Sequence, residues 1–89
     1  MHFDISVKPT FEKRFQKVLD KKTQKQAAKA IRTLEHDPFG LTRIANIKKL
    51  KGQNNIYRLR VGDFRIFYEI DKSKKEVILL TVEHRKDCY

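Results

Sequence analysis

The 89-residue sequence has one cysteine, two prolines, three glycines and no tryptophan. A single cysteine, Cys88, excludes an internal disulfide and a cysteine metal cluster. No apolar run approaches the ~18 residues that a membrane helix needs, and the N-terminus lacks the apolar segment of a signal peptide. With 39% hydrophobic residues, the chain is not typical of a disordered protein. We therefore expect a soluble cytoplasmic protein with no membrane partner, in which residues 1–89 form a single domain.

Acidic residues are also scarce. The sequence has 11 Asp and Glu residues but 21 Lys and Arg residues, so its net charge is +10. Residues 42–65 carry most of the excess, since their only acidic residue is Asp63. The basic residues of this stretch are Arg43, Lys48, Lys49, Lys51, Arg58, Arg60 and Arg65. Such a charge favours a polyanionic partner, which is usually a nucleic acid or an acidic protein.

The first half of the chain predicts one strand and two helices. Apolar residues alternate with polar ones over residues 3–7, which is the period of a half-buried strand. Helical spacing follows over residues 11–19, with Thr10 as the expected N-cap, and the second helix is expected to begin at Thr23. Asp37-Pro38 should end that helix, and residues 39–47 should form a loop.

The second half predicts three strands, over residues 57–61, 64–70 and 77–82. Gly62-Asp63 has the composition of a two-residue type II′ hairpin turn. The unbroken apolar run 77–82 is typical of a central strand. The order β-α-α-β-β-β therefore predicts an α+β fold, with two helices packed on one face of a mainly antiparallel sheet.

A two-residue turn fixes the register of this hairpin. Arg60 then lies opposite Arg65, on the sheet face that the helices leave open, and Arg58 shares that face. Like charges at this spacing are destabilising, and Glu69 is too far along the strand to form ion pairs with both arginines. A bound anion would compensate, and forked guanidinium donors suit a phosphate. The alternative is that these arginines only form the solvent face of an ordinary antiparallel sheet.

Other motifs are weaker. The run Lys48-Lys49-Leu50-Lys51 could contact a phosphate backbone or could form a solvated loop. The three histidines have no metal-ligand spacing, so we expect neither a metal site nor a cofactor. The chain has no glycine-rich phosphate loop, no nucleophile elbow and no carboxylate pair placed for acid–base work. Conventional hydrolase chemistry is therefore not expected.

Three segments resemble the RelE toxins of the RelE/ParE superfamily: KLKG (49–52), YRLRVGDFRIFYEI (57–70) and VEHRKDCY (82–89). The resemblance implies a ribosome-dependent endoribonuclease that cuts mRNA in the ribosomal A site, at the small-subunit decoding site, by attack of the 2′-hydroxyl. It also implies inhibition of translation and neutralisation by a cognate RelB-like antitoxin. By position, the basic and tyrosine residues of that site correspond to Lys51, Arg58, Arg60, Arg65, Arg85 and Tyr89.

This resemblance assigns an expected role to each residue. Arg60 and Arg65 would stabilise the charge at phosphorus, and Arg85 would serve the leaving group. Arg58, with Lys48, Lys49 and Lys51, would bind the RNA. The best-known bacterial relative has lysines at the two strand positions, whereas arginine is a poor general base. We therefore favour Tyr89 as the base. Two alternatives stay open: Tyr89 only stacks on a base of the RNA, or His84, which has a suitable intrinsic pKa but no matching role in the family, acts instead.

Two alternatives to the nuclease function also stay open, namely a ParE-like DNA gyrase inhibitor and a basic RNA-binding protein without catalytic activity.

Overall fold

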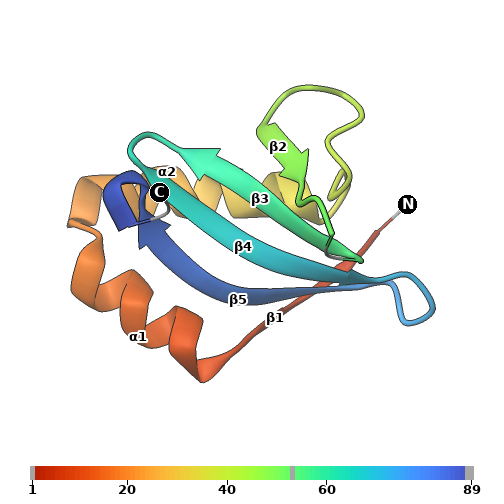
Figure 1. Ribbon diagram of the computed structural model, residues 1–89, viewed down its shortest axis with the longest axis horizontal. Helices are drawn as coiled ribbons and strands as arrows, with labels where there is room; N and C mark the ends of the chain where they lie inside the picture. Colours follow the sequence, from red (N-terminus) through yellow and green to blue (C-terminus); the bar gives the residue numbers. More distant parts are fainter. Residues whose placement is uncertain (1, 53, 88–89) are drawn as a thin grey trace.

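The computed structural model describes residues 2–52 and 54–87 and contains two helices against one five-stranded sheet (Figure 1). The elements in chain order are β1 (Asp4–Val7), α1 (Pro9–Val18), α2 (Lys21–Leu34), β2 (Asn46–Lys49), β3 (Ile56–Val61), β4 (Phe64–Asp71), β5 (Glu76–His84) and the 3₁₀ helix η1 (Arg85–Asp87). The strand order is β1-β5-β4-β3-β2, and the β1–β5 pair is parallel while the other pairs are antiparallel. The predicted α+β fold is confirmed. In the described part of the chain, neither helix has the length and apolar character that a bilayer span requires.

The sheet has one strand more than predicted, because β2 begins within the 39–47 segment that we expected to be a loop. β2 pairs antiparallel with β3 and places Ile47 opposite Leu59, against the core. A four-residue edge strand shows too little alternation to be recognised from sequence. Lys48 and Lys49 therefore lie on a strand, and only Lys51 follows in a turn.

Both predicted helix caps are wrong. α1 begins at Pro9, whose fixed φ suits the first helical position, and its N-cap residue Lys8 makes no side-chain capping bond. α2 begins two residues before Thr23, because the Oδ1 atom of Asp20 accepts a hydrogen bond from the Thr23 amide at 2.8 Å. Hydrogen bonding by the Thr23 side chain, and after it by the Thr23 backbone amide, lowers the pKa of the Asp20 carboxyl.

The hairpin between β3 and β4 has the predicted register. Gly62 adopts a φ of 58°, as the first central residue of a type II′ turn requires. Arg60 pairs with Arg65, and Arg58 pairs with Phe67. A register shift at Phe67/Tyr68 then changes how β4 aligns with β5. β5 lies between β4 and β1, which confirms its predicted interior position.

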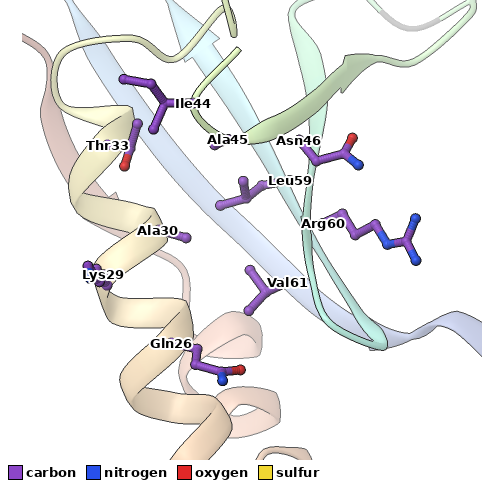
Figure 2. A pocket seen from close by; sticks show the side chains of 10 residues that line it. All are labelled: Gln26, Lys29, Ala30, Thr33, Ile44, Ala45, Asn46, Leu59, Arg60 and Val61. Atoms are coloured by element: carbon purple, nitrogen blue, oxygen red, sulfur yellow. The ribbon is translucent and has the colours of Figure 1, made fainter. Parts of the chain in front are cut away.

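Alternation along β3 separates two faces of the sheet. Figure 2 shows Leu59 and Val61 pointing toward α2, while Arg60 points away from that helix. An open groove of about 340 Å³ lies between α2 and β3, and Ala30 forms part of its lining. The helices therefore cover one face, and the arginines lie on the other.

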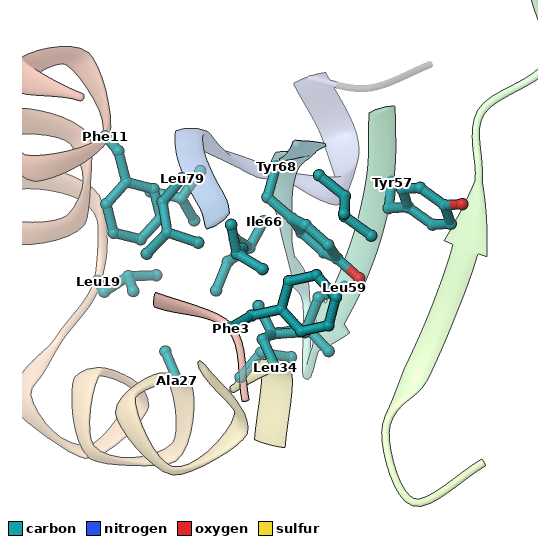
Figure 3. Close-up of a cluster of buried hydrophobic side chains, with 14 residues drawn as sticks. Phe3, Phe11, Leu19, Ala27, Leu34, Tyr57, Leu59, Ile66, Tyr68 and Leu79 are labelled. Atoms are coloured by element: carbon teal, nitrogen blue, oxygen red, sulfur yellow. The ribbon is translucent and has the colours of Figure 1, made fainter. Parts of the chain in front are cut away.

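The core fills the space between the helices and the first of these faces (Figure 3). Phe11 of α1, Leu34 of α2 and Leu79 of β5 are among its buried residues. The phenol of Tyr68 is also buried here and donates a hydrogen bond to the Pro38 carbonyl oxygen at 2.7 Å. Burial raises the pKa of this phenol far above its usual range. The bond ties the loop after α2 to the middle strand of the sheet.

We expect Tyr68→Phe to lower the free energy of unfolding by about 1–2 kcal/mol, because it removes this bond and leaves a buried carbonyl unpaired. The midpoint of thermal unfolding should fall by roughly 5–10 °C. Tyr57→Phe is a matched control, because Tyr57 is also buried but its hydroxyl has no hydrogen bond within the described residues. Equal midpoints for the two variants would contradict this role of the Tyr68 hydroxyl.

Candidate functional site

The sheet face opposite the helices gathers four basic residues from three neighbouring strands. Lys48 of β2 pairs with Arg58 of β3, and Arg60 of β3 pairs with Arg65 of β4. We call these four residues the basic face. Arg60 and Lys48 are exposed, Arg58 is half-buried and Arg65 is buried. The predicted convergence of Arg58, Arg60 and Arg65 is thus present, and β2 adds Lys48 to it.

Arg65 is the unusual member of the basic face, because only 6% of its surface is exposed. Its Nε atom is buried and has no hydrogen-bond partner among residues 2–52 and 54–87. One terminal nitrogen donates a long bond of 3.4 Å to the carbonyl of the preceding Phe64. A buried, unpaired polar atom is costly, and buried charges are usually paired. Within the described residues, the Arg65 guanidinium is therefore held with its Nε donor unsatisfied.

Glu83 of β5 lies directly across from Arg65 in the sheet register. Its carboxylate is nonetheless engaged elsewhere, since Oε1 accepts from Arg14 of α1 at 2.7 Å and Oε2 accepts from the Thr81 hydroxyl at 2.7 Å. Arg14 also donates from Nε to the Val82 carbonyl at 3.2 Å, which fixes its guanidinium beside β5. The nearest acidic neighbour of Arg65 along the sheet is thus neutralised by a different arginine.

Neither Arg14 nor Glu83 was identified from the sequence. The strand pattern identified the Arg60–Arg65 conflict but considered only Glu69 as a compensating acid. Which residue of β5 lies opposite Arg65 depends on the 71–76 turn and on the register shift at Phe67/Tyr68. A sequence pattern does not specify such an irregularity, and it contains no signal that brings α1 to the end of β5.

Arg85 lies beside the β3–β4 hairpin turn, at the same end of the sheet as Arg65. Its backbone amide donates to the Asp63 carbonyl at 2.7 Å, and its Nε lies 3.7 Å from an Asp63 carboxylate oxygen. Both side chains are about half exposed, so this ion pair contributes little to stability and is readily exchanged for another anion. Tyr89 lies outside the described residues.

The other two lysines of the run, Lys49 and Lys51, lie at positions that differ from that of Lys48. Lys49 pairs with the core residue Tyr57, so its position in the strand alternates with that of Lys48 and does not belong to the basic face. Lys51 is exposed in the turn after β2. The sequence had grouped the three lysines in one run, and strand formation separates them.

The arrangement can bind and stabilise negative charge, but it contains little that could move a proton. Tyr57 and Tyr68 are buried on the helix-covered face. His84 packs its ring edge-on against Phe64 at 5.1 Å between centroids, and its Nδ1 accepts the Lys86 amide. The basic face itself, as defined above, consists only of cationic side chains.

A model of the family described as ParE toxin of type II toxin–antitoxin system, parDE, matches residues 5–89. Toxin RelE3 of Methanocaldococcus jannaschii is 46% identical over 44 residues. That alignment covers 49% of this chain and 48% of the relative, so the chain spans about half the length of the curated relative.

Solved structures show the same fold. A chain of the RelB–RelE antitoxin–toxin complex from Methanococcus jannaschii matches with a TM-score of 0.76 and 31% identity, covering 94% of each chain. A chain of the archaeal RelE–RelB complex from Pyrococcus horikoshii OT3 matches with a TM-score of 0.80 and 24% identity, covering 96% of this chain and 97% of the other.

The fold and these similarities together define the class as a small RelE-like toxin. The chain belongs to the family of ParE toxins of type II toxin–antitoxin systems, within the RelE/ParE superfamily.

Proposed function

We propose that this toxin is a ribosome-dependent endoribonuclease that cleaves mRNA in the ribosomal A site and so inhibits translation. The observation that carries the proposal is the buried Arg65 guanidinium, whose Nε has no partner within the described residues. A cation held without a counter-charge on a basic face is suited to an anion that binds from outside. The phosphodiester of RNA is such an anion.

Cleavage by 2′-oxygen attack forms a bond from the 2′-oxygen to phosphorus and breaks the bond from phosphorus to the 5′-oxygen. The step needs a base for the 2′-hydroxyl, a positive field for the charge that develops at phosphorus, and a proton for the departing oxygen. Arg60 is exposed and contacts the phosphate, while buried Arg65 adds a fixed charge directly across the ladder. Fixed charges in a partly desolvated site act more strongly than charges in water.

The other assignments rest on the resemblance to RelE toxins. Arg85, which lies beside the hairpin turn, stabilises the departing 5′-oxygen. Tyr89 acts as the base. Arg58 and Lys48 on the basic face hold the RNA backbone, with the exposed turn residue Lys51 as a further contact. Lys49 has no such role here, because it does not belong to the basic face. Arginine is a poor acid or base near neutral pH because its pKa is above 12. Acid–base catalysis by the toxin alone is therefore weak. The ribosome increases the rate by aligning the 2′-oxygen with the scissile bond.

The partner that neutralises the toxin is a RelB-like antitoxin. This proposal is supported by the similarity to chains from RelB–RelE complexes of two archaea. An acidic antitoxin complements the net charge of +10.

A second candidate function is inhibition of DNA gyrase, and the match to the ParE family model favours it. A gyrase inhibitor needs a protein-binding surface but no RNA-cleaving residues. Under this alternative, the uncompensated charge of Arg65 would have no catalytic role. A basic RNA-binding protein that does not cleave is the third possibility, and net charge alone would support it.

The deciding experiment is cleavage of a defined message by the purified toxin, with and without programmed ribosomes, mapped by primer extension. We expect cuts confined to the decoding codon and absent without ribosomes. Supercoiling by gyrase should be unaffected in a parallel assay. Inhibition of gyrase without any cut would replace the nuclease proposal by the second candidate, and steep salt-dependent RNA binding without either activity would favour the third.

A further inference from the structure

Two histidines far apart in the sequence meet at one end of the molecule. His2 directly precedes β1, and His36 lies just beyond the end of α2. Their ring centroids are 5.8 Å apart, with the rings inclined at 66°. A backbone hydrogen bond of 2.7 Å from Phe3 to the Glu35 carbonyl fixes the two segments side by side.

The ligand atoms of these side chains face one another without hydrogen bonds. One ligand atom each from His2, Glu35 and His36 lie within 4.8 Å of one another. His2 Nδ1 is 4.0 Å from a Glu35 carboxylate oxygen, and His2 Nε2 is 3.7 Å from an oxygen of Asp4. These separations are too long for hydrogen bonds. Within the described ranges, none of these three side chains has a hydrogen bond to another group.

Two imidazoles and one carboxylate are a donor set that suits Zn²⁺. Tetrahedral zinc with bonds of about 2.0–2.1 Å separates its ligand atoms by roughly 3.3 Å. The present separations therefore need to shorten by about 1.5 Å at most, and both imidazoles are exposed side chains that can turn. We propose that His2, Glu35 and His36 form a site for a divalent transition metal ion, with Zn²⁺ as the favoured occupant.

Local charge supports a cation here although the whole chain is basic. Asp4 and Glu35 place two carboxylates beside His2, with Glu35 near its Nδ1 atom and Asp4 near its Nε2 atom. The bound ion would link the start of β1 to the end of α2, which are segments that only the folded chain brings together. Metal binding that requires the fold stabilises the fold. The site lies outside the basic face and does not depend on the proposed nuclease activity.

The test is a titration of the full chain, without a histidine tag, with ZnCl₂ in isothermal calorimetry and in thermal unfolding. We expect one ion per chain and a thermal midpoint raised on the order of 10 °C at a hundredfold excess over Kd. His36→Gln should weaken binding at least about tenfold and remove the thermal shift, because two ligands then remain of three. Circular dichroism checks that this substitution of an exposed residue leaves the fold intact.

His84→Gln is the matched control, since His84 lies in β5 and is not part of the cluster. It should bind Zn²⁺ as the wild type does. Equal affinity of the wild type and His36→Gln would overturn the proposal, and so would absence of a thermal shift in the wild type. The spectrum of Co²⁺ bound in place of zinc gives a second readout, because one of the two imidazole ligands is lost in His36→Gln.

Discussion

Replacing Arg65 by methionine is expected to lower ribosome-dependent cleavage at least about 100-fold without lowering stability. Methionine is an unbranched side chain that fills a similar space but removes the charge. The loss of activity follows because Arg65 supplies a fixed charge opposite Arg60. The stability should be unchanged or higher by roughly 1–2 kcal/mol, because the buried Nε of Arg65 has no partner to lose among the described residues.

The combination of lost activity and retained stability separates a functional arginine from a structural one. A structural buried arginine is paired, and its removal would destabilise the protein strongly. Cleavage is measured by primer extension, and stability by denaturant unfolding of the same preparation. A variant that unfolds at much lower denaturant would contradict the site assignment.

Arg32→Met is the matched control for the change in net charge. Arg32 is exposed on α2, away from the basic face, and its loss lowers the charge of the chain by the same amount. General attraction to the ribosome and to RNA therefore falls equally in both variants. We expect this variant to cleave within about threefold of the wild type. Equal losses in both variants would mean that Arg65 acts only through net charge.

Arg14→Met is expected to lower cleavage about tenfold or more, although Arg14 lies on α1 and not on the basic face. Arg14 holds the carboxylate of Glu83 at 2.7 Å, and Glu83 is the cross-strand neighbour of Arg65. Without Arg14, this carboxylate becomes available to pair with Arg65 and to neutralise it. A hydrogen bond to a charged group contributes about 1.5–3 kcal/mol, and 1.36 kcal/mol corresponds to a tenfold change in rate.

Glu83→Gln in the same chain should restore cleavage, because the amide has no charge with which to neutralise Arg65. A double-mutant cycle of the Arg14 and Glu83 substitutions measures this coupling directly. Failure of the second substitution to rescue the first would show that Arg14 acts by another route. If the wild type does not cleave RNA at all, the NMR signal of the Arg65 Nε proton still reports whether Glu83 pairs with Arg65 in the Arg14 variant.

The hairpin shows how far local sequence can determine a candidate site. Gly62-Asp63 permits a two-residue turn, and the turn fixes which residues oppose one another on β3 and β4. Alternation then places Arg58, Arg60 and Arg65 on one face. These relations involve residues at most nine positions apart, so they follow from period and turn geometry alone.

Other features of the site were wrong or absent in the sequence interpretation. β2 was not recognised from the sequence, because its four residues form a strand only by pairing with β3. The engagement of Glu83 by Arg14 joins residues 69 positions apart. The cluster of His2 with His36 depends on where β1 meets the end of α2, which spacing along the chain does not show.

The sequence by itself determined the basic charge, the order of the two helices and of β1, β3, β4 and β5, and the arginine pair across the hairpin. Each of these rests on composition or on contacts between near neighbours. Only the tertiary structure decided that the Nε atom of Arg65 is buried without a partner among the described residues and that Arg14 engages Glu83. The reason is physical, because burial and charge pairing depend on which distant segments pack together, and that packing minimises the free energy of the whole chain.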